Sequence, residues 1–441
     1  MVQTYSSRRG CLLSVKDKSL RPVACFMRRA IIPLMLLLML IPTTLAQEMD
    51  SVVDVTTVLV IGDADIGIEE IAISPDGEDV LLVGIFGYAH LISSSEPIVQ
   101  VELNTNDDDD LKDVDWHPQG LTALIAGNDG TLLRYTRNDH SVGHVAGSTA
   151  SLMGSQLTAV TWDSSGNWAY IGDDNGLLTR FREDANGYSE YFPINGTKNS
   201  EILDISCLHK MHSVCVVATQ DDGLALIDQE HELHWLTGSE GNRWFSVECP
   251  HPERERCYAV GKSQSVGVVE LNSNSPSSSY VLVKKVEISG EFVGIHARDN
   301  EHLLLQTAPF GWVDWEIMAG EDKMGVAFPW LGNSDVQNTD PAMAGESLVG
   351  SWSESSEVGF GITSYGRVVK YYPPSNTISE NLVSALAPMF VIITVPGVVL
   401  GLIYISSPKL QKKYLAWSNA RRVAKREARK QASPSTRRRK K

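Results

Sequence analysis

The sequence predicts an all-β fold: a seven-bladed β-propeller, followed by one transmembrane helix and a basic cytoplasmic tail. Similar units recur at the spacing of a four-stranded propeller blade. The region between the two apolar ends has no segment of useful length with helical periodicity. An uncharged apolar segment precedes a strongly basic C-terminus. Residues 47–378 are therefore expected to form the propeller domain.

The seven units each contain short β runs joined by turns. In the second unit, a run ending in Trp116 is followed by a Pro/Gly turn, a run over 121–126, a turn at 128–130 and a run over 132–135. Asn, Asp and Gly at such turns accept the positive φ that tight hairpins require. The units cover residues 69–92, 112–136, 158–182, 203–228, 245–271, 293–318 and 348–372.

One aligned column of residues gives the period of the units. The separations along this column are 43, 46, 45, 42, 47 and 56 residues, which match a four-stranded blade. The divergent sixth unit leaves six or eight blades as alternatives. We expect the strand over 52–60 to complete the last blade, and we expect the column tryptophans to pack in the core. The column consists of Ile73, Trp116, Trp162, Cys207, Cys249, His296 and Trp352.

The turn-then-strand pattern resembles the WD40 and WD40-like β-propellers. Its turns read SPDG, HPQG and DSSG, and they are followed by G-x-D-G or D-N-G. The resemblance covers roughly residues 50–375 in blade period, but no blade carries the family's Gly-His start together with a Trp-Asp end. It implies a rigid platform for partners and no particular chemistry.

Four cysteines remain after the expected leader, in two C-x7-C pairs that start at the repeat column. Because directly opposed positions on neighbouring strands bring Cβ atoms within reach of a disulfide, we expect the bridges Cys207–Cys215 and Cys249–Cys257. Two alternatives remain open. Cys207, His209, His212 and Cys215 could form a Cys₂His₂ zinc site, although their spacing differs from that of zinc fingers. Both pairs could also be reduced core cysteines.

The two ends carry targeting signals. Residues 1–46 read as a signal peptide with cleavage after Ala46, and Met27 is an alternative start. Residues 382–406 carry no charge and are long enough to span a bilayer as a helix. The tail, residues 407–441, holds 14 basic residues and one acid, which marks the cytoplasmic side. We therefore expect a single-pass cell-membrane protein with an extracytoplasmic propeller, and a helical tail that lies on anionic lipid. RNA or an acidic protein is the alternative partner of the tail.

The part between these ends is strongly acidic. Subtracting residues 1–46 (7 basic, 1 acidic) and 409–441 (14 basic, 1 acidic) from the totals of 38 and 54 leaves 17 basic and 52 acidic residues, a formal charge of −35. Such a charge keeps an exported domain soluble, and it also suits cation binding or a salty environment. It disfavours nucleic-acid binding, because phosphate would be repelled.

Several loop residues are candidates for binding. Asp107, Asp108 and Asp110 belong to an acidic run whose oxygens could gather calcium, although the pattern lacks the glycine and terminal glutamate of an EF-hand. A solvated loop is the alternative. Trp330 and Asp335 lie in an expected insertion over 318–346, where Trp330 is either a contact residue or part of the core. Asn195 begins an Asn-Gly-Thr glycosylation acceptor.

No catalytic motif stands out. The sequence has no G-x-S-x-G elbow, H-E-x-x-H helix or phosphate-binding P-loop. We therefore expect a non-enzymatic scaffold for a protein or surface-polymer partner, with no cofactor and no bound metal. The alternatives are an exported propeller enzyme such as a glycan hydrolase, or an accessory subunit of a membrane complex. A cluster of inward-pointing carboxylates at one mouth of the channel would favour the enzyme.

Overall fold

A computed structural model describes two units of the chain. It describes residues 51–373, with short gaps at 63–65, 185–186, 209–212, 252–253, 289, 334, 337–342, 344 and 356, and then residues 406–431. The expected signal peptide (1–46) and transmembrane segment (382–406, but for its last residue) lie outside the described residues. Among the residues that are described, no helix is both long and apolar enough to cross a bilayer.

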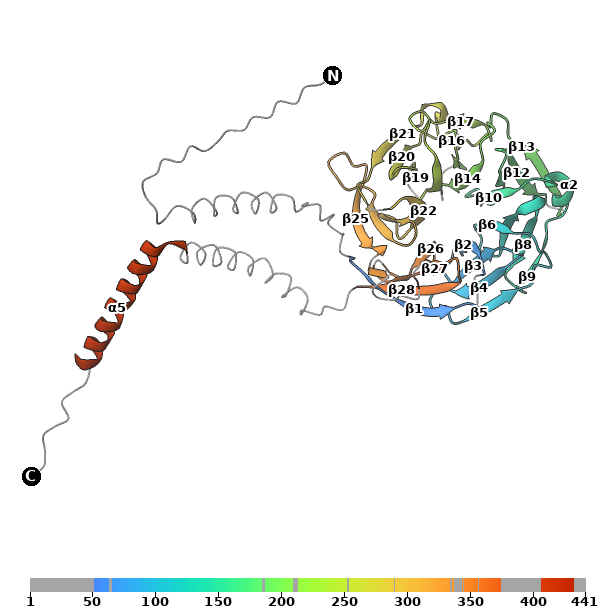
Figure 1. The fold of residues 1–441 in the computed structure, drawn as a ribbon. Helices are drawn as coiled ribbons and strands as arrows, with labels where there is room; N and C mark the ends of the chain where they lie inside the picture. The colour runs from blue at the N-terminus through green and yellow to red at the C-terminus, as the bar shows by residue number, and fades with distance from the viewer. Residues whose placement is uncertain are drawn as a thin grey trace, which may run out of the picture. The chain divides into compact units, whose positions relative to one another are not determined.

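The first unit is the expected seven-bladed propeller (Figure 1). Each blade is an antiparallel four-stranded sheet whose strands follow one another along the chain, and the seventh blade takes its outermost strand from the N-terminus. The blades are β2–β5 (Ile68–Ile73, Asp79–Gly84, Ala89–Ser93, Gln100–Leu103), β6–β9 (Leu111–Trp116, Thr122–Gly127, Leu132–Thr136, Ser141–His144), β10–β13 (Leu157–Trp162, Ala169–Asp173, Leu178–Glu183, Ser189–Pro193), β14–β17 (Ile202–Cys207, Cys215–Thr219, Leu224–Ile227, Leu233–Trp235), β18–β21 (Trp244–Glu248, Arg256–Gly261, Ser265–Glu270, Tyr280–Lys285), β22–β25 (Phe292–Ala297, His302–Thr307, Trp312–Glu316, Val326–Leu331) and β26–β28 (Leu348–Ser353, Gly359–Thr363, Arg367–Tyr372) with β1 (Asp54–Val60). Short helices with described bounds lie in some of the connections, namely η1 (Asn128–Gly130), α2 (Ser148–Leu152) and η2 (Pro276–Ser278).

Strand β1 closes the ring. It pairs antiparallel with β28, from Asp54 opposite Tyr372 to Val60 opposite Arg367. A second set of contacts ties the same segment to blade 6. The Val52 amide donates to the Trp330 carbonyl at 3.0 Å, and the Ser51 hydroxyl donates to the Asp335 carboxylate. The expectation that the N-terminal strand completes the last blade is confirmed.

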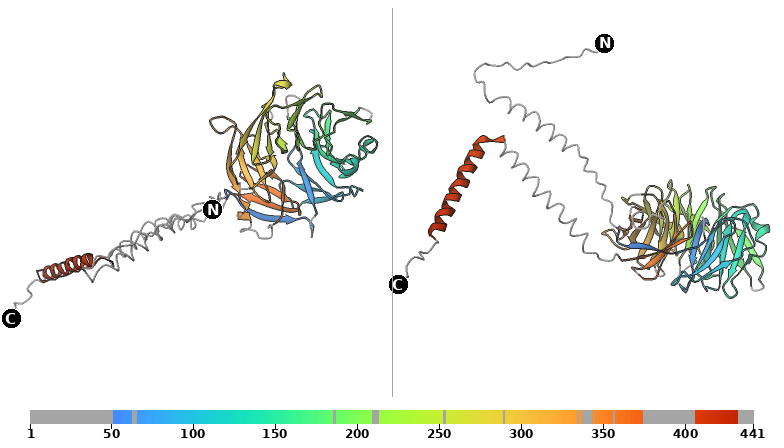
Figure 2. Two further views of the ribbon diagram at one scale, coloured as in Figure 1. Left: turned by 45° about the horizontal axis from the view of Figure 1, so that its top comes forward. Right: turned by 60° about the horizontal axis from the view of Figure 1, so that its bottom comes forward.

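The hydrophobic core is divided among the seven blade interfaces. Each of seven clusters of buried apolar side chains joins residues of two adjacent blades; one of them joins Ile71 and Leu82 of blade 1 to Trp352 and Ile362 of blade 7. The second strand of each blade is buried along nearly its whole length, because both of its faces are covered by neighbouring blades. No blade can therefore bury its faces alone. Figure 2 shows the ring obliquely.

The column tryptophans pack in the core as expected. Trp116, Trp162 and Trp352 are each less than 10% exposed, and the Trp116 indole donates to the Ala72 carbonyl of the preceding blade at 3.0 Å. The alignment was wrong by one residue in the last two units, where the strand pairing puts Ala297 and Ser353 in the column. The first hairpin differs in length between blades, so a fixed offset cannot locate equivalent residues.

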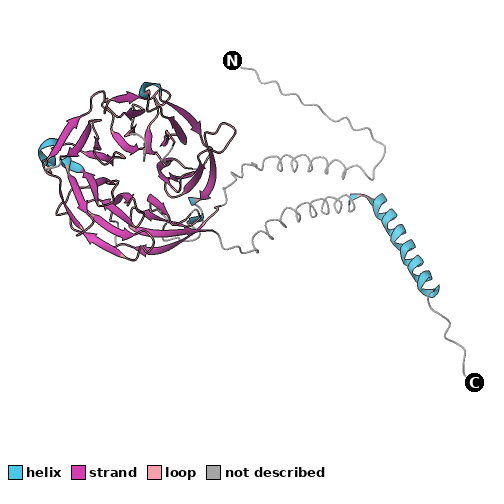
Figure 3. Ribbon diagram, turned by 180° about the vertical axis from the view of Figure 1, so that it is seen from behind, coloured by secondary structure: helices cyan, strands magenta, loops and turns pink. Residues whose placement is uncertain are grey.

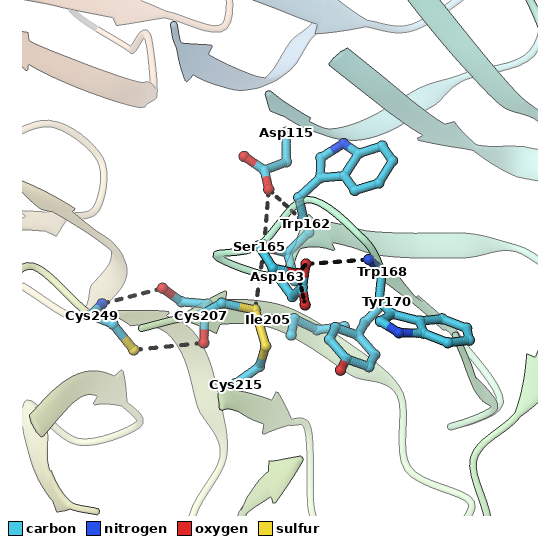
Figure 4. The surroundings of a disulfide bond; sticks show 12 residues. Asp115, Trp162, Asp163, Ser165, Trp168, Tyr170, Ile205, Cys207, Cys215 and Cys249 are labelled. Carbon is cyan, nitrogen blue, oxygen red and sulfur yellow. Dashed lines mark hydrogen bonds between the residues drawn. A yellow bond between two sulfur atoms is a disulfide. The ribbon is translucent and has the colours of Figure 1, made fainter. Parts of the chain in front are cut away.

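Both expected disulfides are present: Cys207–Cys215, which Figure 4 shows, and Cys249–Cys257. Cys207 and Cys215 are paired residues of β14 and β15. Because the disulfide leaves no free thiolate, it rules out the zinc alternative at this pair and the reduced state at both pairs. His209 and His212, the other residues of the alternative zinc site, lie outside the described residues.

The second unit is a single described helix, α5 (Pro408–Gln431). It agrees with the helical composition expected of the tail. Leu410, Tyr414 and Trp417 follow one another at spacings of four and three residues, and the rings of Tyr414 and Trp417 lie 5.9 Å apart. All three side chains are exposed.

Truncating a buried side chain of β1 tests the role of ring closure. Val55 is 2% exposed and belongs to the cluster between blades 6 and 7. We predict that Val55→Ala lowers the free energy of unfolding by about 2 kcal/mol, because it leaves a cavity at that interface. Urea denaturation measures the change, and Thr56→Ala, an exposed neighbour on the same strand, is the matched control. Equal midpoints for the two variants would contradict the role assigned to β1.

Candidate functional site

The innermost strands all carry the same irregularity. In each of the seven blades, the pairing of the first strand with the second shifts by one residue near the start of the first strand, which is a β-bulge. The seven innermost strands gather around the axis of the ring (Figure 3). The extra residues of the bulges are Glu69, Lys112, Thr158, Leu203, Phe245, Val293 and Val349.

These seven bulge residues line one cavity of about 400 Å³. We call it the mouth cavity, because it lies where the innermost strands begin. Its wall is apolar at Leu203, Phe245, Val293 and Val349. It is charged at Glu69 and Lys112, whose carboxylate and ammonium groups lie 3.0 Å apart. Each blade thus contributes one bulge residue to a single opening.

Three carboxyl groups follow the bulge residues in the wall of the mouth cavity: Glu70, Asp113 and Asp204. Two of them hold neighbouring blades together. Asp113 of blade 2 accepts the Val160 amide of blade 3 at 2.6 Å, and Asp204 of blade 4 accepts the Val247 amide of blade 5 at 2.8 Å. Each also accepts the amide of the residue that follows it, at 2.7 Å. Both oxygens of Asp113 and of Asp204 are therefore engaged by main-chain donors.

Two more acids continue the series along the channel. Asp115 of blade 2 accepts the Trp162 amide of blade 3 at 2.7 Å and the Thr161 hydroxyl at 3.0 Å (Figure 4). Glu248 occupies the equivalent position in blade 5. Both side chains are half-buried, so they retain some contact with solvent.

Burial and mutual repulsion make these carboxyl groups hard to ionise. Burial raises the pKa of Asp113 to about 8, and the nearby Asp204 charge adds to the rise. The same two causes raise the pKa of Glu248 to about 8. Burial raises the pKa of Asp115 to about 6 and also raises that of Asp204, while burial and Asp113 raise the pKa of Glu70 well above its usual range.

His296 of blade 6 supplies a neutral group to the same cavity. Burial lowers its pKa to about 4, so the imidazole is uncharged at neutral pH. Gln306, which is 2% exposed, also lines the cavity and donates to the Val349 carbonyl at 3.0 Å. The cavity therefore combines neutral polar groups, apolar side chains and carboxyl groups that change charge near neutral pH.

Asp107, Asp108 and Asp110 lie on the same side of the ring as the mouth cavity. They belong to the connection from β5 to β6, which enters the innermost strand of blade 2 at its cavity end. Asp107 lies 3.2 Å from the His144 ring nitrogen, and Asp110 accepts the Phe86 amide at 3.1 Å. Their roles in binding stay predictions.

Asn195 and Asp335 also lie in connections on this side, and Trp330 is the penultimate residue of β25, which leads into the connection that holds Asp335. Asn195 is exposed, as an acceptor of glycan must be. Asp335 is bonded to Ser51. Trp330 is 8% exposed, with the Arg298 guanidinium 4.3 Å from its ring centre, so it packs in the core and has little surface to offer a partner. Its role in binding also stays a prediction.

Among the described residues, one further group of side chains has the residue types of a metal site. The ligand atoms of Asp228, Glu232 and His234 all lie within 4.8 Å of one another. The Asp228 carboxylate accepts the amides of Glu230 and Glu232, and it lies 2.8 Å from the His234 Nε2. These bonds explain the cluster as a hairpin turn held by an aspartate.

Sequence reasoning missed the acids of the channel. A signal was present: KDVDW, LDISC and EEIAI all place an acid three residues before the column residue. Acids on alternate residues of a strand that ends in a buried tryptophan share one face, and that face could have been assigned to the channel.

Comparison with known proteins agrees with the fold. A scan against protein-family models gave no match, and neither did a search of curated protein sequences. Among solved structures, the chain is similar to "YCF48 bound to D1 peptide", with a TM-score of 0.51, 12% identity and coverage of 76% of this chain and 100% of that one. It is also similar to the β-propeller domain of Cps50 (Swd1) from Myceliophteria thermophila, with a TM-score of 0.56, 8% identity and coverage of 72% and 99%. At such identities the likeness shows the β-propeller fold alone.

The raised pKa of Asp113 predicts that stability depends on pH. Because a carboxyl group with a raised pKa in the folded state ionises first in the unfolded chain, its contribution to stability falls as pH rises from about 4 to about 8. We predict that the wild type loses more stability between about pH 5 and pH 8 than Asp113→Asn does. Urea denaturation at the two pH values measures the difference, with Asp108→Asn on an exposed loop as the control. An equal loss in all three proteins would show that Asp113 ionises normally.

Proposed function

We propose that this protein is a non-enzymatic scaffold that binds a protein partner at the mouth cavity of its propeller. The observation that carries the proposal is the cavity itself, to which every blade contributes a bulge residue. A volume of about 400 Å³ is within the range of ligand pockets, so the cavity can take a short peptide segment or a few side chains of a partner. The solved propeller described as bound to a peptide supports this class of partner.

The lining indicates which segment suits the cavity. Leu203, Phe245 and Val293 offer apolar contact, and interfaces gain most from apolar contacts shielded from water. The carboxyl groups beneath them accept hydrogen bonds or a positive charge. We therefore propose a segment that carries apolar side chains together with a hydrogen-bond donor or a cationic group.

The channel acids are also the feature that would favour a propeller enzyme such as a glycan hydrolase. A glycosidase needs an acid and a base or nucleophile that are free to exchange protons. Here both oxygens of Asp113 and of Asp204 accept main-chain amides, and three of the acids bond the next blade. Structural use of these acids explains their presence without catalysis, and we keep the scaffold as the proposal.

We further propose that the propeller lies outside the cytoplasm and is anchored by residues 382–406, with the basic tail on anionic lipid. Two disulfides support export, since such bonds persist in oxidising compartments. Helix α5 supports the membrane contact, because it combines nine basic residues with the exposed Leu410, Tyr414 and Trp417. Such a protein could equally serve as an accessory subunit of a membrane complex, with its partner in the same membrane.

Photocrosslinking tests the binding site. A photoreactive amino acid in place of Phe245 lies in the wall of the mouth cavity, whereas one in place of Tyr188 lies in the turn from β12 to β13, on the opposite side of the ring. We predict that the Phe245 probe in the full chain, expressed in its own host, gives one main protein adduct that the Tyr188 probe does not give. Mass spectrometry identifies the adduct. Adducts at Tyr188 alone, or none at Phe245, would refute binding at the mouth cavity.

Intact mass tests export and the disulfides together. We predict that the mature protein purified from membranes begins at Gln47 and gains two hydrogen atoms for each of two disulfides on reduction. Recovery in the detergent-solubilised fraction with residues 382–406 intact, and loss from that fraction when they are deleted, is expected of an anchor. A chain that retains residues 27–46, or one found in the soluble fraction at full length, would contradict the proposal.

A further inference from the structure

The outermost strand of blade 5 is unusually apolar for an exposed edge. Strand β21 exposes Tyr280, Leu282 and Val283, at 43%, 37% and 42% of their surface. Among the described residues of the seven outermost strands, no other strand exposes more than one large apolar side chain. A long apolar edge strand attracts other strands, so a soluble protein keeps one only if it is covered or used.

The main chain of β21 is open along part of this edge. The Val281 amide donates to the Thr237 carbonyl at 2.8 Å, away from β20, while the Val286 amide donates to the Gln264 carbonyl of blade 5 at 3.0 Å. Because amides alternate between the two sides of a strand, Val283 and Lys285 direct their N–H and C=O groups away from β20. No main-chain partner for these groups exists among the described residues.

A groove adjoins the end of this open edge, between blades 5 and 6 (β21 and β25 in Figure 1). Its volume is about 210 Å³, which is below the range of small-molecule sites and suits a single apolar side chain. The Trp315 side chain in its wall is fully buried, and its indole N–H has no acceptor in the described part of the chain. The walls are formed by Lys284, Lys285, Val286, Glu287, Ile288, Val313, Trp315, Val326, Ala327 and Phe328.

The lysines decide between two possible occupants. In a second copy of this chain, the antiparallel register that pairs Val283 with Lys285 makes the two exposed Lys285 side chains diagonal neighbours. The Lys284 ammonium group is already paired with the Asp322 carboxylate at 3.5 Å and donates to the Gly325 carbonyl at 2.6 Å, whereas Lys285 has no ion pair among the described residues. Like charges on neighbouring positions of paired strands are destabilising. Pairing with a second copy of this chain is therefore disfavoured at this edge, and pairing with a strand of different sequence is favoured. Lys285 is exposed and favours a carboxylate on that strand.

We propose that an extended, apolar segment of a partner protein, carrying an acidic residue, adds to β21 as a fifth strand of blade 5. One of its apolar side chains enters the groove beside Trp315, and its main chain bonds Val283 and Lys285. This proposal rests on the proposed function as a protein scaffold, but it concerns a second surface, on the rim of the ring rather than at the mouth cavity.

The test uses a substitution that blocks only the outer edge. Because the Val283 amide faces away from β20, Val283→Pro removes an edge donor without removing a bond of the β20–β21 ladder. Glu102→Pro is the matched control, since Glu102 has the same outward position on β5 of blade 1. Phe328→Ala, which removes an exposed wall of the groove, is a second variant that does not alter the strand.

The probe is a phage-displayed library of random short peptides selected on the full chain in mild detergent. We expect selection of apolar peptides with an acidic residue, whose affinity falls about tenfold or more in Val283→Pro and measurably in Phe328→Ala, but not in Glu102→Pro. Peptides that bind all variants equally, or selection of none, would overturn the proposal. Thermal unfolding of each variant shows whether the fold is kept, and Phe328→Ala decides the matter if Val283→Pro does not fold.

The outcome is separable from that of the proposed function. Crosslinking at Phe245 reports the mouth cavity and is expected to persist in Val283→Pro. If no peptide shows Val283-dependent binding but the Phe245 adduct is still formed, the edge site is rejected and the scaffold function is kept. If the Phe245 adduct is absent but the selected peptides still depend on Val283, binding at the mouth cavity is rejected and the edge site is kept.

Discussion

The pairing of β1 with β28 is the constraint on which the rest of the structure depends. Each blade buries its faces only against its two neighbours, and the core is accordingly split into seven interface clusters. An open array would leave two apolar faces in water at its ends. By supplying the outermost strand of blade 7, the N-terminal segment makes the last blade complete and lets it pack on the first. Repeat proteins that do not close need special capping units for the same purpose.

Closure also explains why so many acids lie along the channel. Seven strands meet near the axis with main-chain amides that their own sheets do not satisfy, and a buried amide without an acceptor is costly. Asp113, Asp115 and Asp204 provide acceptors from the preceding blade. The same placement crowds negative groups together, which raises their pKa values. The bonds that join the blades thus determine the chemistry of the cavity above them.

Much of the fold could be predicted from the sequence, because a propeller repeats one pattern many times. The spacing of the units gave the number of blades, the segment before the first unit gave the closing strand, and two C-x7-C pairs gave the disulfides. The register was less predictable. His296 and Trp352 were placed one residue away from their true equivalents because the first hairpin varies in length among blades.

The candidate site could not be assembled from the sequence in the same way. Glu70, Asp113 and Asp204 are separated by more than 40 residues from one another, and only the curvature of the ring brings them to one cavity. A β-bulge has no clear sequence pattern, so the seven bulge residues that line the cavity could not be predicted either. Loop aspartates such as Asp108 were predicted as binding candidates because they belong to a run of consecutive acids, although such runs are common in solvated loops.

The seam in blade 7 has a topological consequence. Asp54 and Tyr372 are paired residues, so the propeller begins and ends at one point on its circumference. The folded chain forms a closed ring, and the packing of the blades does not determine at which blade the ring begins and ends. A gene that started at any other connection between blades would encode the same ring. The chain therefore enters and leaves the ring at paired residues of one blade.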